Sequence, residues 1–268
     1  MLKTQLFNPV YGPVQSWRYG RSLGIDPIGT CSTCSFDCVY CQLGVIERHS
    51  RKREIFVPTD LIQEALAQYY SESGQAEDAI DVVTLSGSGE PTLALNLREI
   101  ITTIKSISHR PVVVLTNGSL LNQSQVRSAL MLADRVAIKV DAVSEDLFQR
   151  INRPVGIEID HFLEHVRTFS DEYSGHLAFQ TMILSAWSID DKARYISFLN
   201  NCMPDEVQLN LPKRPKSRLR NLEARENAPR AISPSELQAL TCVKGDILES
   251  FSALIEQSTG IQTRYPLP

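Results

Sequence analysis

Apolar runs and helical stripes alternate along the chain from residue 80 onward. The runs VVTL, VVVL and VAIKV are almost continuously apolar, which is typical of parallel strands that are covered on both faces. Between them, apolar residues recur at helical spacing, as in Leu97, Ile100, Ile101 and Ile104. The pattern predicts strands over residues 80–87, 111–117, 136–141, 177–184 and 207–211.

Two further elements precede this alternation. A helix is expected after Thr59, with Leu61 and Leu66 on one face, and a strand is expected over residues 22–28. Repeated strand-helix units imply parallel strands joined by right-handed crossovers. Because about six strands are too few for a closed eight-stranded barrel, we predict an α/β fold, a partial (β/α)6 TIM-type barrel of parallel strands with a C-terminal helical extension.

Polar residues follow the predicted strands at their carboxyl ends. Ligands of parallel α/β sheets bind at this edge, because the strand-to-helix loops meet there. The strand assignments therefore place residues 87–90, Asn117, Asp141 and Asn210 on one rim.

The C-terminal part of the chain breaks the alternation. Residues 212–232 are rich in charge and proline, which predicts an extended surface segment. Ser233, Pro234 and Glu236 have the residue types of a capping box and predict the start of a last helix. We expect residues 1–212 to form the barrel domain, with a cysteine loop over 31–44, and residues 213–268 to pack on the same domain.

Composition narrows the class of protein. The chain of 268 residues has 27 Lys and Arg against 31 Asp and Glu, a net charge of -4, which argues against coating nucleic acid through bulk charge. No stretch resembles a signal peptide or is apolar enough to span a bilayer, so we expect a cytoplasmic protein without membrane partners. Four of the six cysteines lie within residues 31–41, which in a reducing compartment indicates a metal or catalytic site.

The spacing of these cysteines favours an iron-sulfur cluster over a structural zinc site. Cys31 and Cys34 form one CxxC pair, Cys38 and Cys41 form another, and only three residues divide the pairs. Structural zinc sites usually join two such pairs across a dozen or more residues. Closely spaced thiolates suit an iron-sulfur cluster better, because each binds a different iron. A zinc site and unligated thiols remain as alternatives.

The motif Cys34-x3-Cys38-x2-Cys41, with Tyr40 directly before the third cysteine, resembles the cluster motif of the radical S-adenosylmethionine (SAM) enzymes. The resemblance implies that the three cysteines hold a 4Fe-4S cluster whose open iron chelates SAM. One electron then cleaves SAM to a 5'-deoxyadenosyl radical, which abstracts hydrogen from a substrate. It also implies that Tyr40 contacts the adenine. Cys31 has no role in this motif.

A second motif, LSGSGEPTL, follows the strand expected over residues 80–87. Glycines at a strand end let a ligand approach the backbone, although an ordinary strand-to-helix turn has the same composition. The motif is similar to the GGEP motif of the same family, with Ser88 in place of one glycine. The resemblance implies that the methionine amino group binds at Gly87, Gly89, Glu90 and Pro91.

Further polar residues match family positions on the rim. The resemblance implies contacts to the ribose or substrate from Asn117 and Asp141, a contact to the methionine carboxylate from Arg153, and a contact to adenine or substrate from Asn210. A turn asparagine, a surface arginine and strand-end caps are the structural alternatives. Lys139 shares a strand face with Asp141, where it could pair with an acid or meet the substrate.

Within the superfamily, the segments GPVQSWRYGRSLGID, CSFDCVYCQLG and LNLPKRPK resemble a subgroup near the wyosine-type tRNA synthases and uncharacterised bacterial relatives. Wyosine-type enzymes hold a second cluster on upstream cysteines. Because this sequence has no cysteine before Cys31, we do not expect the wyosine activity.

The substrate stays open at this stage. RNA is one candidate, because five basic residues cluster in the last part of the chain: Lys213, Arg214, Lys216, Arg218 and Arg220. A solvated loop explains the same cluster, and a small molecule or peptide is the alternative substrate. A non-catalytic iron-sulfur or zinc scaffold is the alternative to an enzyme. The electron donor that the resemblance implies is a flavodoxin or ferredoxin.

Overall fold

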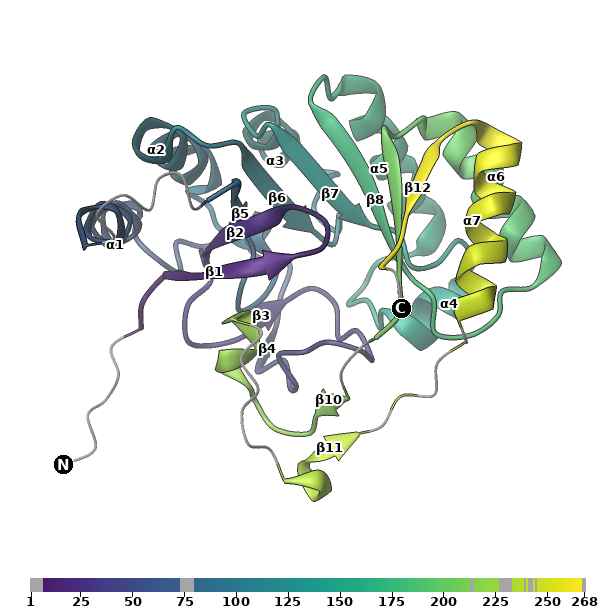
Figure 1. Ribbon diagram of the computed structural model, residues 1–268, viewed down its shortest axis with the longest axis horizontal. Helices are drawn as coiled ribbons and strands as arrows, with labels where there is room; N and C mark the ends of the chain where they lie inside the picture. Colours follow the sequence, from purple (N-terminus) through teal and green to yellow (C-terminus); the bar gives the residue numbers. More distant parts are fainter. Residues whose placement is uncertain are drawn as a thin grey trace.

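The computed structural model describes residues 7–72, 80–212, 215–226, 233–238, 240, 243 and 245–266. Its centre is a curved eight-stranded sheet in the order β1-β2-β5-β6-β7-β8-β9-β12 (Figure 1). All neighbouring strands pair in parallel except β1 and β2, which are antiparallel. The strands are β1 (Val10–Ser16), β2 (Gly20–Ile25), β5 (Val82–Leu85), β6 (Val112–Thr116), β7 (Arg135–Lys139), β8 (His176–Met182), β9 (Glu206–Asn210) and β12 (Gln262–Arg264).

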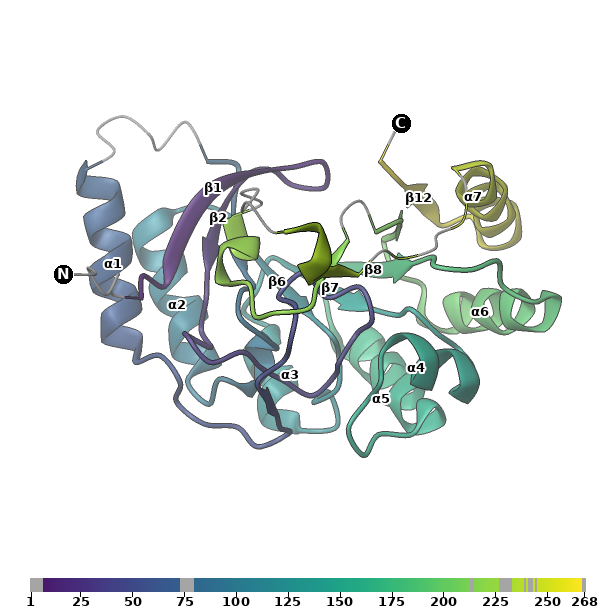
Figure 2. The ribbon, with the colours of Figure 1, turned by 90° about the horizontal axis from the view of Figure 1, so that it is seen from below.

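Seven helices follow the outside of this sheet within the described residues, as Figures 1 and 2 show together. Their apolar stripes pack on the strands: in α2, Leu97, Ile100, Ile101 and Ile104 are fully buried. The helices are α1 (Thr59–Glu72), α2 (Leu97–Ser108), α3 (Ser124–Leu130), α4 (Glu145–Ile151), α5 (Ile159–Glu172), α6 (Ile189–Cys202) and α7 (Gly245–Thr259). No helix in the described ranges has both the length and the apolar character needed to cross a membrane.

The sheet forms a partial barrel, as the sequence predicts. β2, β5, β6, β7, β8 and β9 are the six expected parallel strands, and they lie next to one another in chain order. β1 was not predicted, because Gly12 and Pro13 are residues that argue against a strand in the sequence. It pairs along the outer edge of β2. The barrel opening lies between β1 and β12, where the guanidinium of Arg264 donates hydrogen bonds to the carbonyls of Trp17 and Arg18, both at 3.3 Å.

The cysteine loop lies at the carboxyl end of β2, beside the short strands β3 (Thr33–Cys34) and β4 (Arg48–His49). Phe36 anchors it to the barrel. Its ring is 1% exposed and meets the rings of Phe148 on α4 and Phe162 on α5 edge to face, at 5.4 and 6.2 Å. The loop is therefore held by aromatic packing as well as by its backbone.

The segment after β9 differs from the expected surface segment. Its described part, residues 215–226, runs beside the cysteine loop and includes β10 (Lys216–Ser217) and the 3-10 helix η3 (Leu222–Glu226). Lys216 Nζ contacts Asp37 at 3.3 Å and the Cys38 carbonyl at 3.2 Å. Arg225 Nη1 contacts Asp26, a fully buried carboxylate, at 2.9 Å. These ion pairs hold the charged segment against the cysteine loop and the end of β2.

The C-terminal helix is present, but the predicted start is wrong. At Ser233 the chain makes only a 3-10 turn, η4 (Pro234–Glu236), in which the Ser233 N–H donates to the Glu236 carboxylate at 3.1 Å. The next residues form β11 (Leu237–Gln238), which pairs with β10. The helix α7 begins only at Gly245.

We predict that Phe36→Ala lowers the free energy of unfolding by about 3–5 kcal/mol, because it leaves a cavity between the cysteine loop, α4 and α5. Urea unfolding of the purified protein measures this change. Phe56→Ala is the matched control, since Phe56 is only partly buried and faces Arg48. Equal losses in the two variants would contradict the anchoring role of Phe36.

Candidate functional site

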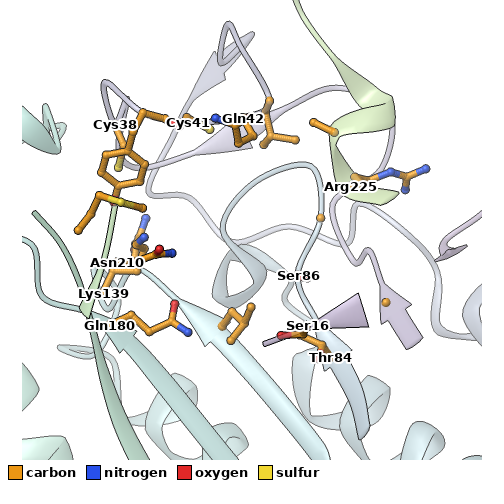
Figure 3. Close-up of a pocket in the computed structure, with 18 of the residues that line it drawn as sticks. Ser16, Cys38, Cys41, Gln42, Thr84, Ser86, Lys139, Gln180, Asn210 and Arg225 are labelled. Atoms are coloured by element: carbon orange, nitrogen blue, oxygen red, sulfur yellow. Dashed lines mark hydrogen bonds between the residues drawn. The ribbon is translucent and has the colours of Figure 1, made fainter. Parts of the chain in front are cut away.

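A cavity of about 980 Å³ lies inside the partial barrel and reaches the carboxyl ends of the strands (Figure 3). Side chains from β1, β2, β5, β6, β7, β8 and β9 line it, together with the cysteine loop and η3. Its volume is at the upper end of what small-molecule sites have. The rim that the sequence predicts is therefore the mouth of a real cavity.

The three motif cysteines share this cavity. Cys34, Cys38 and Cys41 are free thiols that line its wall, whereas Cys31 is exposed and lies outside it. Figure 3 shows Cys38 and Cys41 together on one side, above Lys139. The structure thus brings together the cysteines of the motif and leaves the fourth apart.

The surroundings of these sulfurs contain several hydrogen-bond donors. The Phe36 N–H and the Asn117 side-chain amide both lie 3.5 Å from Cys34 Sγ, and the Asn152 amide lies 3.6 Å from Cys38 Sγ. Burial raises the pKa of Cys38 to about 12, and it raises the pKa values of Cys34 and Cys41 as well. Thiolates here need cationic partners, and a metal centre supplies them.

The sulfur arrangement fits a cluster better than a single ion. Within the described ranges, no three His, Cys, Asp or Glu side chains converge closely enough to hold one metal ion. A tetrahedral zinc site needs such convergence, whereas a 4Fe-4S cluster places each cysteine on a different iron. Three partly buried thiols on one cavity wall, with amide donors beside two of them, therefore fit a three-cysteine cluster.

The Gly-Ser-Gly-Glu turn after β5 packs directly against the cysteine loop. The Thr33 N–H donates to the Ser88 carbonyl at 3.1 Å, and the Glu90 N–H donates to the Thr33 carbonyl at the same distance. A Cβ atom at Gly89 would lie 1.7 Å from the Thr33 carbonyl oxygen. Only glycine permits this approach, which explains one glycine of the motif.

Glu90 is held rigidly in the cavity wall. Its carboxylate is 2% exposed and accepts hydrogen bonds from the Thr92 N–H and hydroxyl, the Thr116 hydroxyl and the Asn117 N–H, at 2.5–3.0 Å. Burial raises its pKa. No lysine or arginine of the described chain pairs with it. Pro91 is buried behind it at the start of the 3-10 helix η2 (Pro91–Leu93).

Tyr40 and Asp141 form a linked pair. The Tyr40 hydroxyl donates to Asp141, which also accepts from the Asn152 side-chain amide at 2.7 Å and the Met182 N–H at 2.8 Å. Lys139 Nζ lies 4.6 Å from the centre of the Tyr40 ring. Asp141 thus orients Tyr40. Tyr40 lines the cavity, whereas Asp141 does not.

The remaining predicted residues divide in two. Asn117 and Asn210 line the cavity, and Figure 3 shows Asn210 beside Lys139 and Gln180. Arg153 does not line it: its side chain is 56% exposed and faces Asp37 at 3.8 Å. Arg153 therefore touches the cysteine loop, where its carbonyl also accepts from the Asp37 N–H at 3.3 Å, but its side chain lies outside the cavity.

Several cavity residues were missed from the sequence. Gln180 lies in the middle of β8, and Arg18 lies in the turn after the unpredicted strand β1. Arg225 and its partner Asp26 join segments 199 residues apart in the sequence. The signal for two of them was the segment GPVQSWRYGRSLGID, which contains Arg18 and Asp26.

We predict that Gly89→Ala lowers stability by about 1–3 kcal/mol, because the added methyl group overlaps the Thr33 carbonyl. For a chain of this size, each kcal/mol lowers the thermal midpoint by roughly 2–4 °C. Gly245→Ala is the control, since its Cβ would meet nothing within 4 Å. An unchanged midpoint for Gly89→Ala would show that the two loops are not in close contact.

Comparisons with known proteins agree with this geometry. The family model of the radical SAM superfamily matches residues 28–199. A UPF0026 protein of Synechocystis is 49% identical over 96% of this chain and 96% of its own length. These results confirm the resemblance to the superfamily and to the uncharacterised bacterial relatives near the wyosine-type synthases.

Solved structures share the fold at low identity. The structure of TYW1 with a lysine-pyruvate adduct bound has a TM-score of 0.57 at 15% identity, covering 88% of this chain and 73% of that one. A radical SAM methyltransferase from Sphaerobacter thermophilus has a TM-score of 0.59 at 14% identity, covering 91% and 65%. The predicted partial barrel is confirmed.

Proposed function

Because this chain belongs to the radical SAM superfamily, whose enzymes use a 4Fe-4S cluster and SAM, we propose that it abstracts hydrogen from a substrate bound in the barrel cavity. The observation that supports this most is that Cys34, Cys38, Cys41 and Glu90 all line one cavity. When bound, the cluster supplies the electron that splits SAM into methionine and a 5'-deoxyadenosyl radical, which takes a hydrogen atom from the substrate.

Each residue around the cysteines is assigned to one part of the cluster or of SAM. Cys34, Cys38 and Cys41 hold three irons of the cluster. Glu90 accepts the methionine ammonium group, because its carboxylate is buried beside Cys34 without a cation of its own. Tyr40, oriented by Asp141, contacts the adenine. Asn117 donates to Cys34 and, with Asn210, borders the nucleoside.

Lys139 is better placed than Arg153 for the methionine carboxylate. It lines the cavity near Cys38 and Cys41, and it forms no ion pair with any carboxylate in the described structure. Arg153 lies outside and faces Asp37. We therefore assign the carboxylate contact to Lys139.

The cavity wall is partly apolar, which would help to shield a radical from solvent. Its apolar lining residues include Phe36, Leu43, Ile46, Leu115 and Met182. A cluster scaffold without catalysis needs neither this cavity nor Glu90, so both favour an enzyme.

The structure weakens the basis for an RNA substrate. Lys213 and Arg214 lie outside the described residues. Lys216 and Arg220 are used in ion pairs with Asp37 and Glu47, at 3.3 and 3.1 Å. These pairs leave less charge for a phosphate backbone. A small polar molecule inside the cavity is the substrate class that we favour, and a flavodoxin or ferredoxin remains our proposal for the electron donor.

The main test is release of 5'-deoxyadenosine from anaerobically reconstituted protein that is given SAM and dithionite. We expect release from the wild type and a loss of at least about tenfold in Cys38→Ala, because the cluster loses a ligand. Cys31→Ala is the control and should keep its iron content and its release. Full release from Cys38→Ala would refute the ligand assignment.

A second test compares Lys139→Met with Arg153→Met. Isothermal titration of SAM into the reconstituted proteins should show about tenfold weaker binding for Lys139→Met, the loss of one charge-assisted contact, and no change for Arg153→Met. The reverse result would return the carboxylate contact to Arg153.

A further inference from the structure

We propose that the end of the cavity farthest from the cysteines binds an anionic group of the substrate, a phosphate or a carboxylate, through Arg18. The proposal rests on the function proposed above and narrows its substrate class. Arg18 lines the cavity from the turn between β1 and β2, whereas the cysteine loop follows the other end of β2. The five residue steps of β2 separate the two ends by roughly 17 Å.

Figure 3 shows the two sides of the cavity. Ser16, the last residue of β1, lies on the opposite side of the cavity from Cys38 and Cys41. Its hydroxyl accepts hydrogen bonds from the N–H groups of Arg18 and Tyr19, at 3.2 and 3.3 Å, and so shapes the turn. The turn thus holds Arg18 at a defined place at this end.

The guanidinium of Arg18 has no counterion in the described part of the chain. Its Nε atom is buried without a hydrogen-bond partner, its guanidinium carbon lies 5.3 Å from the centre of the Trp17 ring, and its other electrostatic neighbour is the neutral Tyr19 side chain. Glu206 interacts with Tyr19, the residue next to Arg18, and with Gln208. Its carboxylate already forms an ion pair with Arg264, with 3.4 Å between Oε2 and Nη1. Arg18 is partly buried, and a guanidinium whose Nε atom is shielded from water without a partner is unfavourable, so an anion from outside would stabilise it.

The other charges of the cavity are accounted for. Arg225 is neutralised by Asp26. Glu90 and Lys139 lie near the cysteines and match the ammonium and carboxylate groups of SAM. Arg18 is therefore the one charged group on the cavity wall that neither the described chain nor SAM neutralises. Its partner has to come with the substrate.

Gln180 adds a second recognition element. This side chain is 6% exposed and lines the cavity, and its amide nitrogen donates to Gln208 Oε1 at 2.8 Å. Its own carbonyl oxygen receives no hydrogen bond from the described residues. A ligand hydroxyl or amine would satisfy it. The two features together fit a small polar molecule with an anionic group and a nearby donor.

The test is isothermal titration of reconstituted, SAM-saturated protein with glycerol 3-phosphate, succinate and neutral glycerol at constant ionic strength. We expect at least one anion to bind and glycerol not to bind. Arg18→Gln should weaken anion binding about tenfold or more, and Arg18→Lys should weaken it less. The preferred anion identifies a phosphate or a carboxylate site.

Two controls separate this proposal from structural damage and from the proposed function. Arg21→Gln removes an arginine of β2 that does not line the cavity and should bind the anions as the wild type does. Arg18→Gln should unfold at no lower temperature than the wild type and should keep its SAM affinity, because Arg18 lies away from the cysteine end of the cavity. Failure of SAM cleavage in the wild type would instead refute the proposed function, while the anion titration without SAM would still report on Arg18.

Two results would overturn the proposal: neither anion binds the wild type, or both anions bind Arg18→Gln as tightly as the wild type. Thermal unfolding gives a second measurement. Each binding anion should raise the midpoint of the wild type more than that of Arg18→Gln at the same concentration, because the stabilisation falls as the affinity falls. Equal shifts in both proteins would count against Arg18.

Discussion

The buried carboxylate of Asp26 joins the parts from which the site is made. One oxygen accepts the N–H groups of Ile28 and Gly29, at 2.9 and 3.2 Å. The other accepts the Ser88 N–H and hydroxyl, at 3.0 and 2.6 Å, and the Arg225 guanidinium at 2.9 Å. A fully buried charge is tolerated only with such partners, so the end of β2, the glycine turn and η3 are constrained together.

This constraint produces a site that is organised before any ligand binds. Glu90 is held by four donors, and Tyr40 is held through Asp141 and Asn152. The close approach of Gly89 to Thr33 fixes the glycine turn against the cysteine loop. Groups that are fixed in this way need little reorganisation when SAM binds, which is what a reactive site requires.

The cavity is chemically divided along the barrel axis. Near the cysteines it combines thiols and apolar side chains with one acid and one lysine, Glu90 and Lys139. At the other end it offers Arg18 from the β1–β2 turn, while Gln180 of β8 lies between the two ends, beside Lys139 and 3.5 Å from the Tyr19 hydroxyl. The first half suits a cofactor common to the superfamily. The second half suits recognition of an individual substrate, and it is built by the least regular part of the sheet.

The sequence determined the features that depend on local pattern. Continuous apolar runs predicted the central parallel strands, periodic stripes predicted helices such as α1 and α2, and cysteine spacing with a glycine-rich strand end predicted the chemistry. These features could be predicted because burial on both faces of a strand, or on one face of a helix, leaves a direct trace in residue order.

Only the tertiary structure decided the rest, because those features depend on contacts between distant segments. β1 is a strand because it pairs with β2 despite Pro13, and residues 215–226 lie inward because Arg225 meets Asp26. The loop after α4 directs the Arg153 side chain away from the cavity. Lys139, the last residue of β7, lines the cavity instead. Long-range pairing, which residue order does not encode locally, selected the residues that surround the ligand.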